Sequence, residues 1–206
     1  MVMQLTHKHD LCTEMIGDGI LTLVESGAVT NRRNNYLPVK MVATFTLGSS
    51  KLYRFMDRNP ALEIHPVDFT NDPALAGLDD KLIAINATLQ VDLLGQCGSE
   101  SLGFRPIRAP AASPTLRAAN RSRGGKAFIV LPSIAKNDSI LRIVPVLSPG
   151  THVSTSKHDI NVVVTEYGAA QLRGKSAKQR ALELIGIAHP DFRGDLMEQA
   201  GRMRIL

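Results

Sequence analysis

The feature that most constrains the fold of this 206-residue chain is a short apolar run near its C-terminal end. Residues 160–165 are Ile-Asn-Val-Val-Val-Thr, and three consecutive valines leave neither face of a strand polar. A run of this kind is typical of a central strand that is covered on both faces, as in a sheet flanked by helices. It predicts an α/β architecture.

Periodic apolar patterns elsewhere predict both kinds of element. Helical spacing predicts four helices, over residues 15–26 (ended by Gly27), 49–59, 177–188 and 191–202, and Asp72 before Pro73 marks a further helix start. Strands are predicted over residues 41–47, 62–65, 82–94, 127–131, 140–147 and 160–165. Strands interleaved with helices predict an α/β domain with a mixed sheet flanked by helices. The length fits one domain, or two small ones at most.

The composition excludes several classes of protein. Hydrophobic residues make up 44% and charged residues 21%, which is ordinary for a globular chain. No apolar run approaches the roughly 18 residues of a membrane span, and the N-terminus lacks the apolar core of a secretory signal. Cys12 and Cys97 are too few for a disulfide framework, and neither they nor the scattered histidines have metal-ligand spacing. We expect a cytoplasmic protein with no metal and no membrane partner.

The net excess of positive charge lies in one segment. Residues 101–126 hold six basic residues and no acidic one, so that without them the chain has 18 basic against 19 acidic residues. Such a segment could attract nucleic acid, and a steep loss of affinity with salt would be its signature. The segment contains a single aromatic residue, Phe104, so it lacks the stacking platforms of single-strand binders. We expect no nucleic-acid partner.

Part of this basic segment has no regular pattern. Residues 107–116 contain Pro110 and Pro114 and show neither helical nor strand periodicity. A solvated linker is the simplest interpretation, although a structureless loop of about 20 residues is unusual inside a compact domain. We predict an irregular conformation from Arg105 to Arg117.

Glu14 is a candidate catalytic residue. With Thr13 as the N-cap of the predicted helix, Glu14 would lie in its first turn, near the positive end of the helix dipole. A carboxylate there stays ionised, as a nucleophilic carboxylate must. Acidic residues also occupy first turns for stability alone, so position by itself leaves both interpretations open.

Five ordered blocks of sequence decide between the catalytic and the purely structural interpretation of Glu14. They are residues 14–19 (Glu-Met-Ile-Gly-Asp-Gly), 85–96, 124–133, 164–176 and 188–193 (Ala-His-Pro-Asp-Phe-Arg). Together they resemble the C-terminal half of the acetyl-CoA hydrolase/transferase family, which includes 4-hydroxybutyrate and butyryl-CoA:acetate CoA-transferases. The resemblance implies the CoA-transferase-like fold of that C-terminal domain over residues 1–206. It also implies that the family's N-terminal CoA-binding domain is missing ahead of Met1.

The resemblance implies a chemistry and a site. Glu14, in Cys12-Thr13-Glu14-Met15, stands where the family has its nucleophilic glutamate, which forms an acyl-glutamyl anhydride and then a glutamyl-CoA thioester. Asn86 and Leu89 would lie beside the pantetheine or acyl group, and Lys136 would contact CoA. For residues 165–168 we favour a structural role, as a strand-to-helix turn near the site. The expected cofactor is coenzyme A, and the expected partners are an acyl-CoA, a short-chain carboxylate, the N-terminal domain and a second copy of the chain. Hydrolysis is open beside transfer, and so is an inactive fragment or assembly module.

The chain departs from the family at three places. At Leu89-Gln90 the family usually has a glutamate after the aliphatic residue. The stretch before the nucleophile is two residues shorter than the family's, and a glycine-rich block is expected where Ile107 to Arg117 stands. Loss of one base from codons for Y-S-G-T-G-G-Q-S-D-F would yield the observed residues 107–116, with the frame restored at Arg117. This frameshift hypothesis is tested by sequencing the gene, and an intact frame would contradict it.

Overall fold

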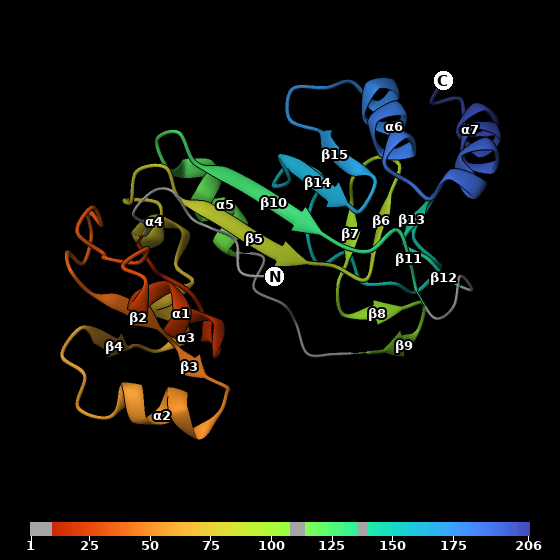
Figure 1. Ribbon diagram of the computed structural model, residues 1–206. Coiled ribbons are helices and arrows are strands. Elements are labelled where there is room, and N and C mark those ends of the chain that lie inside the picture. Colours follow the sequence, from red (N-terminus) through yellow and green to blue (C-terminus); the bar gives the residue numbers. More distant parts are fainter. Residues whose placement is uncertain (1–9, 108–113, 136–139) are drawn as a thin grey trace. The chain divides into compact units, whose positions relative to one another are not determined.

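The computed structural model describes residues 10–107, 114–135 and 140–206 (Figure 1). The chain divides into two compact units, of which unit 1 holds Met1–Leu82 and Arg121–Gly125 and unit 2 holds Ile83–Asn120 and Lys126–Leu206. None of the helices in the described ranges is long and apolar enough to cross a membrane.

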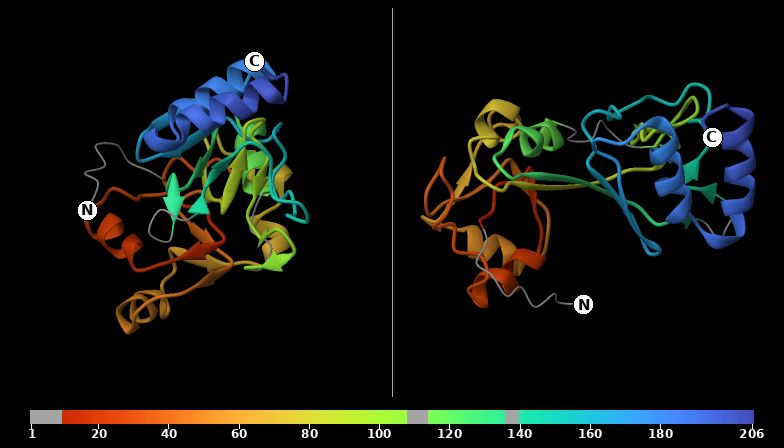
Figure 2. Two further views of the ribbon diagram at one scale, coloured as in Figure 1. Left: turned by 90° about the vertical axis from the view of Figure 1, so that its right-hand side faces the viewer. Right: turned by 90° about the horizontal axis from the view of Figure 1, so that it is seen from above.

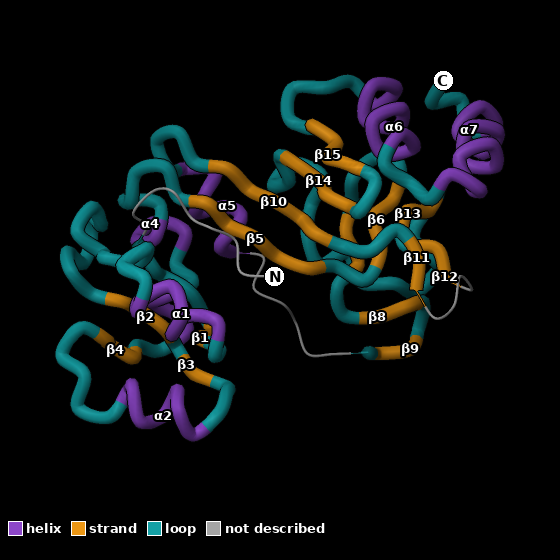
Figure 3. The backbone as a smooth tube through the Cα atoms, viewed as in Figure 1, coloured by secondary structure: helices purple, strands orange, loops and turns teal. Residues whose placement is uncertain are grey.

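Unit 1 is built from very short strands and helices joined by long connections (Figure 3). Its elements are β1 (Met15–Ile16), α1 (Gly19–Glu25), β2 (Met41–Ala43), β3 (Phe45–Thr46), α2 (Ser50–Met56), β4 (Leu62–Ile64), α3 (Val67–Thr70) and α4 (Pro73–Ala76). β1 pairs in parallel with β3, and β2 in parallel with β4. Its core comprises Ile16, Ile20, Leu21, Val29, Met41, Ala43 and Leu52.

Unit 2 contains the main sheet, in the order β15-β14-β10-β5. The strands are β5 (Ile83–Ala87), β10 (Lys126–Val130), β14 (Val162–Thr165) and β15 (Gly168–Gln171), and only β15 runs antiparallel to its neighbour. The valine run forms the interior strand β14, in which Val163 is fully buried, so the predicted mixed α/β sheet is confirmed. β5 is an edge strand. It is buried on one face, as the alternation through residues 82–94 indicates, but Ala84 lies on the buried face and Ile83 and Ile85 are exposed.

The remaining strands of unit 2 form three smaller sheets. They are β6 (Gln90–Asp92) between β13 (Ile143–Val144) and β7 (Cys97–Gly98), the pair β8 (Ser101–Leu102) and β9 (Arg105–Pro106), and the pair β11 (Ile134–Ala135) and β12 (Ile140–Leu141). The predicted strand 82–94 is therefore two strands in different sheets. Thr88 lies at the break, where its buried hydroxyl donates to the carbonyls of Gln90 and Gly98.

The helices of unit 2 are α5 (Pro114–Arg121), α6 (Ala177–Gly186), the 3₁₀ turn η1 (Pro190–Phe192) and α7 (Arg193–Arg202). α6 and α7 lie side by side, and α6 packs against β15 (Figure 2). A capping box starts α6: the Ser176 hydroxyl accepts from the Gln179 amide, and the Gln179 side chain accepts from the Ser176 amide. The two predicted C-terminal helices are confirmed, with a break at His189-Pro190.

The predicted irregular segment is wrong where the structure describes it. β9 covers Arg105–Pro106, and α5 begins at Pro114 and buries Leu116 fully. Proline suits a first helical turn because its missing N–H is not needed there. Regular structure at these positions counts against the frameshift hypothesis, whose other residues, 108–113, lie outside the described ranges.

Candidate functional site

Glu14 is fixed by its own backbone at the start of β1. Its carbonyl oxygen accepts hydrogen bonds from the amides of Thr44 and Phe45, both at 3.0 Å. The residue lies in a bend, and its side chain is half-buried. The parallel pairing of β1 with β3 thus fixes the backbone of Glu14, from which the carboxylate side chain extends.

The helix predicted over residues 15–26 is wrong at its N-terminal end. Met15 and Ile16 pair with Phe45 and Thr46 as a strand, and α1 starts only at Gly19. Asp18, which precedes α1, makes no cap; its carboxylate instead accepts from the backbone amide and hydroxyl of Ser49. Glu14 is therefore not in a first helical turn, and the helix-dipole argument for its ionisation does not apply.

The side chain of Glu14 is held by Asn71, a residue that the sequence analysis missed. The amide Nδ2 of Asn71 donates to Oε2 of Glu14 at 2.6 Å. Asn71 follows α3 as its C-cap, and its own Oδ1 is buried with no hydrogen-bond partner in the described part of the chain. No local pattern connects the two residues, because they are 57 positions apart.

A second contact joins the same two regions. The hydroxyls of Thr44, between β2 and β3, and Thr70, the last residue of α3, are hydrogen-bonded to each other. Thr70 is buried, and its backbone amide bonds to the carbonyl of Pro66 within the helix. The end of α3 is thus anchored beside Glu14, which places the Asn71 amide at the carboxylate.

Cys12 lies close to Glu14 in the chain, but its thiol is a weak nucleophile at neutral pH. Burial, with a smaller contribution from the negative charge of Asp79, raises the pKa of the Cys12 thiol to about 11. The thiol is therefore protonated at neutral pH, and the thiolate is the nucleophilic form. Cys12 therefore does not compete with the Glu14 carboxylate as a nucleophile.

The predicted CoA contacts belong to unit 2. Asn86 is half-buried on β5, and its Oδ1 accepts from the hydroxyl of Thr115 at 3.3 Å. Leu89 links β5 to β6; its amide donates to Gly98, and its carbonyl accepts from the guanidinium of Arg142 at 2.8 Å. Lys136 lies outside the described residues. Glu14 belongs to unit 1, so the expectation that it shares one CoA site with these residues stays a prediction.

Residues 165–168 form a hairpin turn between β14 and β15, and the predicted strand-to-helix turn is wrong. The carboxylate of Glu166 in this turn accepts from the amide of Ser133 at 2.9 Å and from its hydroxyl at 2.5 Å. Burial acts to raise the pKa of Glu166, but the hydrogen bonds from Ser133 outweigh it and hold the pKa below its usual value. Glu166 thereby anchors the chain just after β10.

The basic segment is partly neutralised. Arg117 pairs with Asp159 at 3.0 Å, and Arg123 forms an ion pair with Asp80. Both carboxylates come from outside residues 101–126, so a count of charges within that segment does not include them. These pairs weaken the case for a nucleic-acid surface.

Unit 1 holds the Glu14 carboxylate against the amide of Asn71, and unit 2 contains an α/β sheet. Comparisons with known proteins identify the family. Residues 48–200 match the family described as "Acetyl-CoA hydrolase/transferase C-terminal domain", and the chain belongs to that family.

Among curated relatives, the succinyl-CoA:cyclohexane-1-carboxylate CoA transferase of Geobacter metallireducens is 53% identical over 97% of this chain and 46% of its own length. The 4-hydroxybutyrate coenzyme A transferase of Clostridium kluyveri is 44% identical over 91% of this chain and 44% of its own. The chain thus spans less than half the length of these relatives.

Solved structures agree with this fold assignment. RipA from Yersinia pestis matches 98% of this chain and 46% of its own with a TM-score of 0.91 and 35% identity. A 4-hydroxybutyrate CoA-transferase from Porphyromonas gingivalis matches 96% of this chain and 46% of its own with a TM-score of 0.81 and 37% identity. The CoA-transferase-like fold predicted from the resemblance is confirmed.

Proposed function

We propose that this chain carries the nucleophilic half of an enzyme that moves CoA from an acyl-CoA to a carboxylic acid through a glutamyl-CoA thioester on Glu14. The observation that carries the proposal is the hydrogen bond from Asn71 to Oε2 of Glu14. Membership of the family and the transferase names of the relatives support the reaction class.

We assign separate roles to the two carboxylate oxygens in this proposal. Asn71 holds Oε2, so Oε1 attacks the thioester carbonyl, and the C–S bond breaks to give an acyl-glutamyl anhydride and CoA thiolate. The thiolate then attacks the glutamyl carbon and releases the acyl group as a carboxylate. In that step negative charge develops on Oε2, where the Asn71 N–H already points, and a preorganised donor of this kind stabilises the transition state.

The second half of the reaction reverses these steps with a different acid. The incoming carboxylate attacks the glutamyl thioester and expels CoA thiolate, and the thiolate takes the acyl group from the resulting anhydride. Water in place of the acid gives hydrolysis, and one relative, from Kluyveromyces lactis, is named an acetyl-CoA hydrolase. We assign transfer as the main reaction because the Geobacter and Clostridium relatives, which are more similar to this chain than the Kluyveromyces hydrolase is, are both named transferases.

The remaining assignments rest on the family resemblance. Asn86, Leu89 and Lys136 are proposed to contact CoA, and an N-terminal domain and a second copy of the chain are proposed to complete the enzyme. We place the enzyme in the cytoplasm, in keeping with two free thiols, Cys12 and Cys97. An inactive assembly module is the alternative.

The test uses two proteins: this chain, and a chimera that joins the N-terminal portion of the Geobacter relative to it. Each is incubated with acetyl-CoA and then with borohydride, which reduces a glutamyl thioester to an alcohol that peptide mass spectrometry detects. We expect the modification at Glu14 in the chimera and little in the chain alone.

The matched control replaces a different glutamate. Glu14→Gln should abolish exchange of label between acetate and acetyl-CoA, whereas Glu25→Gln, at the exposed end of α1, should keep it. Full exchange by the Glu14→Gln chimera would overturn the assignment of the nucleophile. A folded chimera without any exchange would favour the assembly module.

A further inference from the structure

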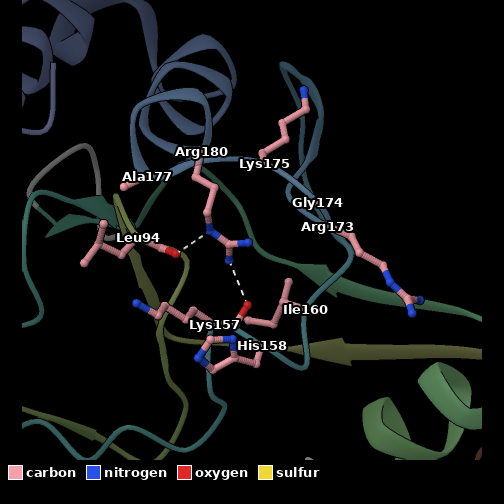
Figure 4. Close-up of a pocket in the computed structure, with 9 residues that line it drawn as sticks. All are labelled: Leu94, Lys157, His158, Ile160, Arg173, Gly174, Lys175, Ala177 and Arg180. Atoms are coloured by element: carbon pink, nitrogen blue, oxygen red, sulfur yellow. Dashed lines mark hydrogen bonds between the residues drawn. The ribbon is translucent and has the colours of Figure 1, made fainter.

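The pocket at the start of α6 is occupied with structural contacts. Figure 4 shows Arg180 on its wall, and the guanidinium donates at 2.7–2.9 Å to the backbone carbonyls of Leu94, Leu172 and Lys157. Lys175, which also lines the pocket, is paired with Glu183. Both basic side chains are therefore engaged within the protein, and binding potential is better sought elsewhere.

The short parallel pair β1–β3 in unit 1 exposes an apolar face (Figure 3). Met15 and Phe45 are partners in register, so their side chains lie on the same face. Leu47 follows two positions after Phe45 and continues the ladder, since its amide donates to the carbonyl of Ile16. The exposed fractions of Met15, Phe45 and Leu47 are 47%, 45% and 67%. We refer to these three residues as the apolar face of β1–β3.

The opposite face of the pair belongs to the core of unit 1. Ile16 is only 3% exposed and lies in one cluster with Ile20, Ala43 and Leu52. Parallel strands occur almost only where both faces are covered, and a strand with one wet face usually carries polar residues there. β1–β3 is apolar on both faces, yet the described residues cover only one of them. The composition of the exposed face therefore indicates a contact surface.

The relatives indicate what covers this face. The chain spans 46% and 44% of the Geobacter and Clostridium transferases, and the matching family model describes a C-terminal domain, so their remaining portion precedes the matched part. A domain joined ahead of Asp10 enters the described chain five residues before Met15, and five residues span at most about 18 Å. The apolar face thus lies close to the point of attachment.

A second copy of the chain fits the apolar face less well. Stable contacts between separate proteins bury about 800 Å² on each partner, with roughly 20–30 residues a side. Three side chains supply only a small part of such a surface. A tethered domain is held at a high effective concentration and can therefore be retained by a smaller contact.

We infer that the apolar face of β1–β3 is the contact surface for an N-terminal domain of the kind that the relatives carry. The domain supplies the second cover that the parallel pair lacks, beside the backbone of Glu14, whose carbonyl accepts from the Phe45 amide. The inference rests on the N-terminal partner included in the proposed function, but not on the reaction at Glu14.

Hydroxyl-radical footprinting with peptide mass spectrometry measures the exposure of single side chains, and it is applied to this chain and to the chimera with the Geobacter N-terminal portion. We expect Met15 and Phe45 to be oxidised readily in the chain alone and severalfold more slowly in the chimera. Met197 on α7 is the matched probe, since it is 42% exposed and outside the apolar face. It should be oxidised at the same rate in both proteins.

Leu47→Asp in the chimera places a charge in the apolar contact and should return the oxidation rate of Met15 towards that in the chain alone. Leu78→Asp is the matched control, because Leu78 is another leucine of unit 1, 56% exposed and outside the apolar face. It should leave the protection of Met15 unchanged. Thermal unfolding of both variants, made in the chain alone, checks that unit 1 still folds.

Three results would overturn the inference: equal oxidation of Met15 in the chain and in a folded chimera, protection of Met15 already in the dilute chain alone, or equal effects of Leu47→Asp and Leu78→Asp. Protection in the chain alone that grows with protein concentration would overturn it as well, by assigning the face to a second copy. The Glu14→Gln chimera should protect Met15 as fully as the unmodified chimera, so failure of the transferase proposal leaves this result distinct.

Discussion

The side-chain amide of Asn71 lies 2.6 Å from Oε2 of Glu14, although 57 residues separate the two along the chain. The contact is made possible by two backbone features, the β1–β3 pairing that fixes Glu14 and the end of α3 that presents Asn71. Asn71 is thus a positioning residue for the proposed nucleophile.

Replacement of Asn71 by alanine in the chimera should lower kcat by about 10²–10³, the loss typical of one preorganised donor at a developing oxyanion. KM for the acyl-CoA should change little, because Asn71 touches the nucleophile and not the remote part of the substrate. Steady-state label exchange provides both constants, and the exposed Asn35→Ala is the control. A fall in thermal stability that accounts for the entire loss of activity would contradict a role in positioning.

The Gly95→Ala variant should unfold at a clearly lower temperature than the wild type. Gly95 has a φ of +86°, and a Cβ there would lie 2.4 Å from a guanidinium nitrogen of Arg180. Strain and displacement of Arg180 should together cost about 1–3 kcal/mol of stability. Gly186→Ala, in α6 with no atom within 4 Å of its Cβ, should stabilise the protein by about 0.4–1 kcal/mol. Equal effects of the two variants would show that the Arg180 contact does not matter.

Both cysteine thiols should react slowly with iodoacetamide at pH 8 in the native protein and rapidly after denaturation. Burial raises the pKa of Cys12 to about 11 and that of Cys97 to about 12, from an ordinary value of 9.0. A thiol whose folded pKa is raised favours folding below its unfolded pKa, and this contribution is lost as the pH rises through the folded value. Stability should therefore decline from about pH 9 to pH 12. A C12S/C97S variant should show a smaller decline, and an identical pH profile would rule out the thiols as its cause.

The Lys175–Glu183 pair should stabilise the protein at neutral pH and not in acid. The hydrogen bond from Lys175 lowers the pKa of Glu183, so its contribution is present above the unfolded pKa, ordinarily 4.5, and disappears as the pH falls through the lower folded value. Glu183→Gln should cost up to about 1 kcal/mol at pH 7, the range for an ion pair that solvent still reaches. Urea denaturation at pH 7 and pH 3 measures the difference, with Glu198→Gln as an exposed control. The same loss at both pH values would assign the effect to packing.

The elements that the sequence predicted well are those whose packing is local or two-sided. The apolar stripe of α6 and the valine run of β14 each carry their own signal, and both appear in the structure. The resemblance, rather than periodicity, supplied the candidate nucleophile.

The errors arise where distant pairing overrides local pattern. The helical spacing that begins at Met15 does not reveal that Met15 and Ile16 pair with β3 as a strand. The alternation through residues 82–94 does not reveal that the chain passes from one sheet to another at Thr88. α5 was missed because residues 107–116 show no helical period, whereas the helix begins at Pro114 and runs on to Arg121, with Leu116, Ala118 and Ala119 buried. Asn71 could not be found at all, since a hydrogen bond across 57 residues leaves no local trace.

The guanidinium of Arg180 joins three carbonyls from three separate stretches of chain, at Leu94, Lys157 and Leu172. Release of any one stretch leaves an N–H donor of the buried Arg180 guanidinium unpaired, which makes partial opening costly. The amides of these stretches and of α6 should consequently exchange with deuterium as one cooperative unit rather than fray singly. One buried arginine side chain thereby sets how this corner of unit 2 opens.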